Sequence, residues 1–347
     1  MLPVQFEIEL TTKCNARCPG CSRTVDGETH PNLKITEINF DEFENIFPPI
    51  FVRQRHFGFS GVFGDPCMAK DLLPICEYLL QHGAERVYVD TNGGMQTQAF
   101  WSSLSNISAF YDKKLTVNFN VDGYESTNHI YRVNVNWNKL VDNMRVYSGN
   151  GGRAVWQYIE FDHNLQDIED AKSLSKQLGF YFQLRRSTRN ISSWTSIIKT
   201  KNNTKTVEIT TSKQHSKSQE QIQIIDKIKN QQTIRFDDVN CRLIHQRHAY
   251  ISHDQKLWPC CWYGDMYSNN VLETEGYNKL RELEQIYGVD WNCLKNNSID
   301  KIVEHNYYKQ VLQQSWDPSH NLHINKCIIH CGGHGTRRNT EYATATS

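Results

Sequence analysis

The sequence predicts an α/β protein in which parallel strands alternate with helices, followed by a smaller cysteine-rich region. Up to about residue 190, short runs rich in β-branched and aromatic residues alternate with helical patterns, as expected of parallel strands joined by crossover helices. A polar segment follows each of these runs. Six of the eleven cysteines fall in the last third of the chain, which predicts a second region of different character.

Six strands are expected in the first region. They cover residues 4–10, 56–60, 86–90, 115–121, 154–161 and 181–185, and helices are expected between them, for example at 72–82 and 168–178. The segments that follow the strands are rich in Cys, Gly, Asn, Asp and Arg. Active sites of parallel α/β barrels lie at the carboxyl ends of their strands, so we expect the chemistry on that face.

Composition excludes several classes of protein. The chain has 347 residues, enough for one large and one smaller domain. Lys+Arg and Asp+Glu balance at 38 each, so no bulk binding of nucleic acid is expected. There is no apolar run of bilayer-spanning length and no secretory pattern at the start, so we expect a cytoplasmic protein without a membrane span. Cysteines there are expected to be reduced or metal-bound.

Three cysteines lie close together on the loop that follows the first expected strand. Cys14, Cys18 and Cys21 form a CxxxCxxC pattern. Iron–sulfur clusters are held by cysteine thiolates, and a [4Fe-4S] cluster with three protein ligands has one iron left open to another ligand. The alternatives are a structural zinc site or three unrelated reduced thiols, although zinc more commonly uses paired CxxC knuckles.

This loop resembles the signature of the radical S-adenosylmethionine (SAM) superfamily. The resemblance implies a partial TIM-type (β/α)6 barrel and a [4Fe-4S] cluster bound to the three cysteines and SAM. In that family, the open iron chelates the amino and carboxylate groups of SAM. Reduction of the cluster cleaves SAM to methionine and a 5′-deoxyadenosyl radical, which abstracts hydrogen from a substrate.

Three further strand ends carry similar segments. Residues 61–66 are similar to the family's GGEP segment, with Asp65 in place of the usual Glu; residues 91–93 resemble its TNG turn; residues 120–123 are similar to its S-x-D-G. Each fragment alone has a simpler explanation, such as Asp65 as a helix cap. Gly20 stands where many members carry an aromatic residue. By resemblance, the expected SAM contacts are Gly64, Asp65, Pro66, Asn92, Asn120 and Asp122.

A basic cluster at residues 185–189 follows the sixth expected strand. Arg185 is a candidate for binding a carboxylate or phosphate inside the barrel, because guanidinium binds such groups bidentately. The alternative is a solvated loop paired with acidic neighbours. Alternation along the strand implies that Arg185 and Arg186 face opposite sides.

The C-terminal cysteines resemble those of the SPASM or twitch extension of radical SAM enzymes. The resemblance lies in Cys241, an expected hairpin at 248–259 closed by Cys260-Cys261, and Cys327-x3-Cys331. It implies one auxiliary [4Fe-4S] cluster with Cys241, Cys260, Cys327 and Cys331 as ligands. Cys261 is the alternative to Cys260, Cys293 has no recognisable spacing, and a zinc ribbon would use the same ligand set.

These expectations define four segments: a radical SAM barrel at 1–190, a polar linker or insertion at 191–235, a SPASM/twitch-like domain at 236–334 and a mobile tail at 335–347. The implied function is reductive SAM cleavage, with a peptide or protein segment as substrate and flavodoxin or ferredoxin as electron donor. The alternatives are a twitch-type dehydrogenase of a small sugar, aminocyclitol or nucleotide, and a non-catalytic zinc-binding protein.

Overall fold

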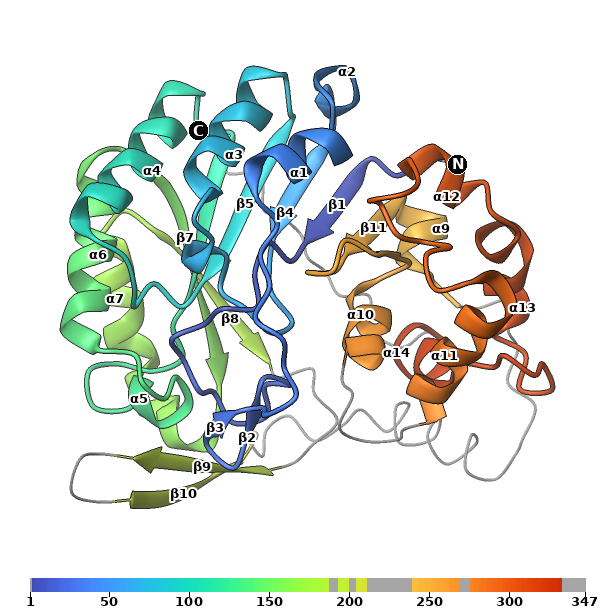
Figure 1. The fold of residues 1–347 in the computed structure, drawn as a ribbon. Coiled ribbons are helices and arrows are strands. Elements are labelled where there is room, and N and C mark those ends of the chain that lie inside the picture. Colours follow the sequence, from blue (N-terminus) through green and yellow to red (C-terminus); the bar gives the residue numbers. More distant parts are fainter. Residues whose placement is uncertain (1, 187–192, 200–203, 211–238, 269–274, 333–347) are drawn as a thin grey trace.

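The centre of the molecule is an eight-stranded sheet (Figure 1). The computed structural model describes residues 2–186, 193–199, 204–210, 239–268 and 275–332. Within them, the strands follow the order β12-β11-β1-β4-β5-β6-β7-β8, and every neighbouring pair is parallel except β11 and β12. The strands are β1 (Gln5–Ile8), β4 (His56–Phe59), β5 (Arg86–Thr91), β6 (Leu115–Asn120), β7 (Arg153–Glu160), β8 (Tyr181–Arg186), β11 (His248–Ile251) and β12 (Leu257–Trp258).

All six strands expected from the sequence are present, as β1 and β4 to β8, and they lie side by side in chain order. The α/β class with a partial barrel is therefore confirmed. Helices along the chain cover one face of this sheet (Figure 1). They are α1 (Phe40–Ile46), α2 (Pro49–Val52), α3 (Leu72–Gln81), α4 (Gln98–Phe110), α6 (Trp137–Gly149) and α7 (Ile168–Gln177), with the short η1 (Pro66–Met68), α5 (Asn128–Tyr131) and η2 (Asp162–Asp167) at strand exits.

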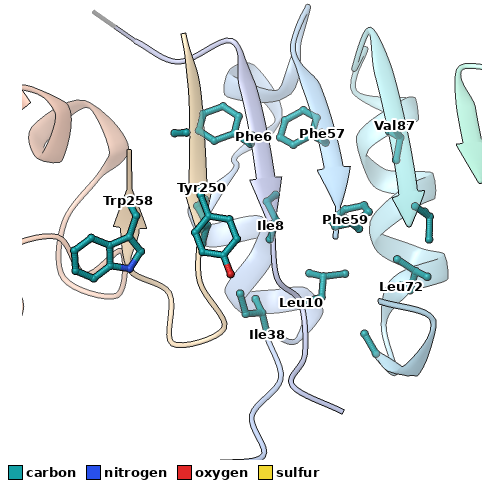
Figure 2. Packing of buried hydrophobic residues seen from close by; sticks show 14 of the residues in the cluster. Phe6, Ile8, Leu10, Ile38, Phe57, Phe59, Leu72, Val87, Tyr250 and Trp258 are labelled. Carbon is teal, nitrogen blue, oxygen red and sulfur yellow. The ribbon is translucent and has the colours of Figure 1, made fainter. Parts of the chain in front are cut away.

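Alternating side chains of the strands form the core beneath these helices. Phe6 of β1 is in register with Phe57 of β4, and their rings stack with centroids 5.8 Å apart (Figure 2). Ile8 and Phe59 form the next pair along the same face. Each buried phenylalanine contributes about 2 kcal/mol of hydrophobic stabilisation. The other face of the same strands carries Glu7, Glu9 and further polar side chains, so the core fixes which residues face the barrel interior.

The hairpin expected before Cys260 is present and extends the main sheet. β11 pairs in parallel with β1, from Gln5–His248 to Ile8–Ile251, and β12 turns back antiparallel to β11. Gln255 in the turn has φ +63°, the left-handed conformation for which glycine is more usual. The C-terminal helices form a second group beside β11 and β12 (Figure 1). They are α9 (Arg242–Gln246), α10 (Cys261–Ser268), α11 (Glu275–Tyr287), α12 (Ile299–Val303), η5 (Tyr307–Val311), α13 (Leu312–Gln314) and α14 (Asn325–Cys331).

The segment expected as a polar insertion contains a hairpin that the sequence analysis did not anticipate. β9 (Ser193–Lys199) and β10 (Thr204–Thr210) pair antiparallel over seven residue pairs. Ser196 Oγ donates to the Ile130 carbonyl oxygen of α5 at 2.7 Å, and Thr210 Oγ1 donates to Asp162 Oδ2 at 2.5 Å. The expected boundaries at 190 and 235 and the expected tail at 335–347 lie outside the described residues and stay predictions.

None of the helices in the described ranges has both the length and the apolar character that a bilayer crossing requires.

Candidate functional site

The first cysteine group lies on the long loop between β1 and α1. Burial raises the pKa of Cys14, and the nearby Asp65, Cys18 and Cys21 raise it further, so the three sulfurs lie within electrostatic reach of one another. The Cys21 N–H donates to the Cys18 carbonyl oxygen at 3.2 Å. Gly20 between them has φ +70°, which explains why glycine rather than an aromatic residue stands there.

Arg132 lies beside this group and was not singled out by sequence reasoning. Its Nη1 lies 3.8 Å from Cys18 Sγ, and its Nε forms a 2.7 Å ion pair with Asp122 Oδ2. Burial raises the pKa of the Cys18 thiol, and Arg132 offsets part of that rise. Burial also raises the pKa of Asp122, against the effect of Arg132. Arg132 directly follows α5, ten residues after Asp122, and only the fold brings it to Cys18.

Asp122, expected to contact SAM, is fully buried, and both of its carboxylate oxygens have protein partners. Oδ2 accepts the hydrogen bond that Arg132 Nε donates, and Oδ1 accepts the Ile159 N–H at 2.6 Å. Its own N–H donates to Asn128 Oδ1 at 3.1 Å. These contacts make Asp122 the residue that holds Arg132 toward Cys18.

Asp65 joins the loops that follow β4 and β5. Its carboxylate accepts the Cys67 N–H at 3.0 Å, the Thr91 hydroxyl at 2.9 Å and the Asn92 N–H at 2.8 Å. It is the N-cap of η1, so the cap explanation is present in the structure. Burial raises its pKa, while these hydrogen bonds work in the opposite direction. A direct contact of Asp65 with SAM stays a prediction.

Asn92 ties the TNG turn to the cysteine loop. Its Nδ2 donates to Asn15 Oδ1 at 2.8 Å and to Asp65 Oδ2 at 2.6 Å, and lies 3.8 Å from Cys14 Sγ. Asn120 lies at the end of β6 in register with Gln157, and its side chain is partly exposed. The structure therefore brings the segments after β1, β4 and β5 together, and it leaves the Asn120 side chain accessible.

Arg185 of β8 faces the interior of the barrel. It donates to Gln183 Oε1 through Nε at 3.0 Å and Nη2 at 2.9 Å. Burial raises the pKa of Asp90 on β5 to about 6, and Arg185 counteracts that rise. Arg185 also lowers the pKa of Asp122. Its positive charge therefore acts on two carboxylates of the barrel.

The second cysteine group assembles from four separate segments. Burial raises the pKa of Cys260 to about 12, with further contributions from Cys241 and Cys331. Burial raises the pKa of Cys327 as well, and Cys260, Cys241 and Cys331 add to it. The Asn240 N–H donates to the Cys331 carbonyl oxygen at 2.8 Å, which fixes the segment before α9 on the end of α14. The four cysteines expected as auxiliary ligands thus lie within electrostatic reach of one another, and their role as ligands stays a prediction.

Three further cysteines have contacts of their own. Burial raises the pKa of the Tyr250 hydroxyl, and Cys261, the alternative to Cys260, adds to that rise. Cys293 forms a β-bridge with Lys256, and Cys67 is a buried residue of η1. Among the described residues, no three His, Cys, Asp or Glu side chains converge as ligands of one metal ion. The three thiols of the first group form no disulfide.

Comparisons with known proteins identify the fold. No family model matches the chain, and no curated protein matches it. Streptococcus suis SuiB bound to S-adenosylmethionine has a TM-score of 0.55 at 10% identity, covering 89% of this chain and 68% of SuiB. SuiB bound to its precursor peptide SuiA has a TM-score of 0.54 at 11% identity, and the match covers 89% of this chain and 66% of SuiB. Native anSMEcpe with bound AdoMet has a TM-score of 0.51 at 13% identity, and the match covers 89% of this chain and 82% of anSMEcpe. These neighbours are radical SAM enzymes, so the chain shares their fold; it spans about two thirds of the length of SuiB.

Proposed function

We propose that this chain is a radical SAM enzyme, in which Cys14, Cys18 and Cys21 hold a [4Fe-4S] cluster whose open iron binds SAM. The observation that carries the proposal is the gathering of three free thiols at the exit of β1, in a fold shared with SAM-bound radical SAM enzymes. The sequence motif and the fold point to this function independently.

The donor set fits an iron–sulfur cluster. Cysteine thiolates are its usual ligands, and the positive charge of a metal favours deprotonation of thiols whose pKa burial has raised. When bound by these three cysteines, a reduced cluster would supply the electron for the reductive cleavage of SAM. The protein binds, orients and shields these groups.

The chain's own residues then divide this work. Arg132 offsets the negative charge at Cys18, and Asp122 holds Arg132 in place. Asp65 and Asn92 fix the loops around Cys14. The Gly64 and Pro66 backbone and the accessible amide of Asn120 are the proposed SAM contacts, and Arg185 is proposed to bind an anionic group of a ligand in the barrel.

We propose that the second group, Cys241, Cys260, Cys327 and Cys331, holds an auxiliary [4Fe-4S] cluster. Four thiols also suit zinc, so the choice of metal rests on the shared fold. The effect of Cys241 and Cys331 on the pKa of Cys260, and of Cys260 on that of Cys327, supports Cys260 as the fourth ligand.

A peptide or protein segment is the proposed substrate. SuiB, of the same fold, has been crystallised with a precursor peptide. The β9–β10 hairpin is a further support: in the described part of the chain each strand pairs only with the other, so each has an edge that an added strand could use. The hairpin lies against the cysteine loop, since a Cβ on Gly27 would come within 2.9 Å of the Ile197 Cβ. A flavodoxin or ferredoxin in the cytoplasm is the proposed electron donor.

Anaerobic purification tests the proposal. Two [4Fe-4S] clusters predict about eight irons per chain, a brown colour and an EPR signal after reduction that changes when SAM is added. Reduced protein should convert SAM to 5′-deoxyadenosine. A colourless protein that carries zinc and leaves SAM intact would refute the enzyme.

A further inference from the structure

A buried glutamate that the proposed chemistry does not use lies at the exit of β1. Glu9 is 1% exposed and precedes Cys14 by five residues. It follows Gln5 and Glu7 on the face of β1 that points into the barrel, away from the core side chains Phe6 and Ile8. A buried carboxylate is retained only where donors surround it.

Two of those donors are backbone N–H groups of the loop after β4. Glu9 Oε1 accepts the Phe63 N–H at 2.6 Å and the Gly64 N–H at 3.2 Å, while Oε2 accepts the Tyr250 hydroxyl at 2.9 Å. Buried N–H groups require an acceptor, and Glu9 provides one for both. One side chain directly after β1 thus binds the segment expected to contact SAM.

These hydrogen bonds set the direction in which the loop carbonyls point. In a planar trans peptide, the N–H and the C=O lie on opposite sides. With the Phe63 and Gly64 N–H groups directed at Glu9, the preceding carbonyls face the cysteine loop. The Val62 carbonyl oxygen lies 3.7 Å from Cys21 Sγ, and the Phe63 carbonyl oxygen lies 3.5 Å from Arg23 Nη1.

The backbone of the loop after β4 lies in contact with the backbone at the exit of β1, so a side chain at Gly61 or Gly64 would not fit. A Cβ on Gly64 would lie 1.7 Å from the Thr11 carbonyl oxygen, and a Cβ on Gly61 would lie 1.9 Å from the Gly64 carbonyl oxygen. Because the backbones touch, the loop has little freedom to shift. Rotation of its peptide planes is the change that remains open to it.

We propose that Glu9 is a positioning residue for SAM binding: it orients the peptide planes of residues 62–64 so that the loop presents its carbonyl groups to the cysteine loop and to SAM. This inference rests on the proposed function, because it assumes that the loop binds SAM. Tyr250 holds the other carboxylate oxygen and links the same residue to the C-terminal hairpin.

Three variants of the full chain, purified anaerobically, separate this role from general stability. Glu9→Met keeps the approximate size of the side chain and removes both acceptors. Glu9→Gln keeps an acceptor for the two N–H groups. Tyr250→Phe removes only the third partner. The measurements are iron content and SAM affinity by equilibrium dialysis.

With iron content unchanged, Glu9→Met should bind SAM about tenfold more weakly, the loss expected when buried N–H groups are left without an acceptor. Glu9→Gln should recover most of the affinity, and Tyr250→Phe should stay within about twofold of the wild type. SAM affinity in Glu9→Met equal to that of the wild type, or equal losses in all three variants, would overturn the inference.

Hydrogen exchange provides a second measurement that does not depend on SAM or on folding of the Met variant. The amides of Phe63 and Gly64 should exchange slowly in both the wild type and Glu9→Gln. Rapid exchange in the wild type would overturn the inference. Failure of the wild type to bind SAM would refute the proposed function instead, and the orientation of the loop would then be decided by exchange alone.

Discussion

The two cysteine groups of this protein are built in opposite ways. The first occupies one short loop after β1, where Cys14, Cys18 and Cys21 are close because they are close in sequence. The second draws Cys241, Cys260, Cys327 and Cys331 from across the last third of the chain. A local motif can bind its ligand once the loop forms, whereas an assembled group requires the C-terminal fold. Ligand binding at the second group should therefore contribute more to folding.

Their surroundings differ as well. Arg132 lies beside Cys18 and lowers its pKa, against the effect of burial. At the second group the hydroxyl of Tyr263 lies 3.6 Å from Cys327 Sγ and favours the thiolate as a neutral donor. The first group thus has a cation to offset added negative charge, which suits a site that receives an electron.

The largest expected effect separates the two groups. Cys18→Ala should abolish reductive SAM cleavage and remove about half of the iron, while Cys327→Ala should remove the other half. Iron analysis and 5′-deoxyadenosine formation measure both. Cys76→Ala, which changes a fully buried cysteine of α3 outside both groups, is the control. SAM cleavage at the wild-type rate in Cys18→Ala would contradict the assignment of the first group.

The membership of the second group is tested by two adjacent residues. Cys260→Ala should lose the auxiliary iron, whereas Cys261→Ala should retain it, because Cys260 is the residue whose pKa Cys241 and Cys331 raise and which raises the pKa of Cys327. Thermal unfolding should show a lower Tm only for Cys260→Ala. The reverse pattern would make Cys261 the ligand.

Substitution of Arg132 tests the electrostatic difference between the two cysteine groups. Arg132→Met should lower the reduction potential of the first cluster by tens of millivolts, since it removes a positive charge near Cys18. It should also destabilise the protein by about 3 kcal/mol, because Asp122 is left buried without its ion pair. The double variant Asp122→Asn/Arg132→Met should recover much of the stability and keep the lowered potential.

Arg145→Gln is the matched control, since Arg145 forms an exposed ion pair with Asp142. Spectroelectrochemistry and thermal melts measure the two effects separately. An unchanged potential in both Arg132 variants would remove this residue from the account of the first group.

The smallest effect concerns Glu9, which connects the two regions through Tyr250. Burial raises the pKa of Glu9 from 4.5 to about 7; Tyr250 and the loop amides oppose the rise, and Asp254 adds to it. Because the pKa of Glu9 is higher in the folded protein than in the unfolded chain, protonation of Glu9 stabilises the fold. This contribution to the free energy of unfolding is complete below pH 4.5 and is lost as pH rises through 7. Between those limits the wild type should lose at most about 3 kcal/mol relative to Glu9→Gln.

Anaerobic melts of both proteins at mildly acidic and mildly alkaline pH measure this difference. Glu9→Gln should gain in relative Tm at the alkaline pH. A parallel pH dependence of the two proteins would show that Glu9 does not titrate in this range.

Features set by local pattern could be predicted from the sequence, and features set by distant contacts could not. The six barrel strands follow from alternating hydrophobic runs, and the first cysteine group follows from its spacing. The second group was predicted by resemblance, although spacing left Cys260 and Cys261 equivalent. In the structure, Cys261 is the first residue of α10 and Cys260 precedes the helix.

The missed residues act across long separations. Arg132 reaches Cys18 over more than a hundred residues, and Glu9 meets Tyr250 over an even greater distance along the chain. The β9–β10 hairpin was missed because its strands are short of the strongly apolar residues that mark the barrel strands. Pairing of β11 with β1 was also missed, because a parallel pairing between distant segments leaves no local signal.

Mössbauer spectroscopy of iron-enriched, anaerobically purified protein tests the central claim most directly. We expect cubane clusters in the wild type, with one iron site whose spectrum changes when SAM is added and which is missing in Cys18→Ala. A spectrum without a cubane cluster, or one that is indifferent to SAM, would contradict the account.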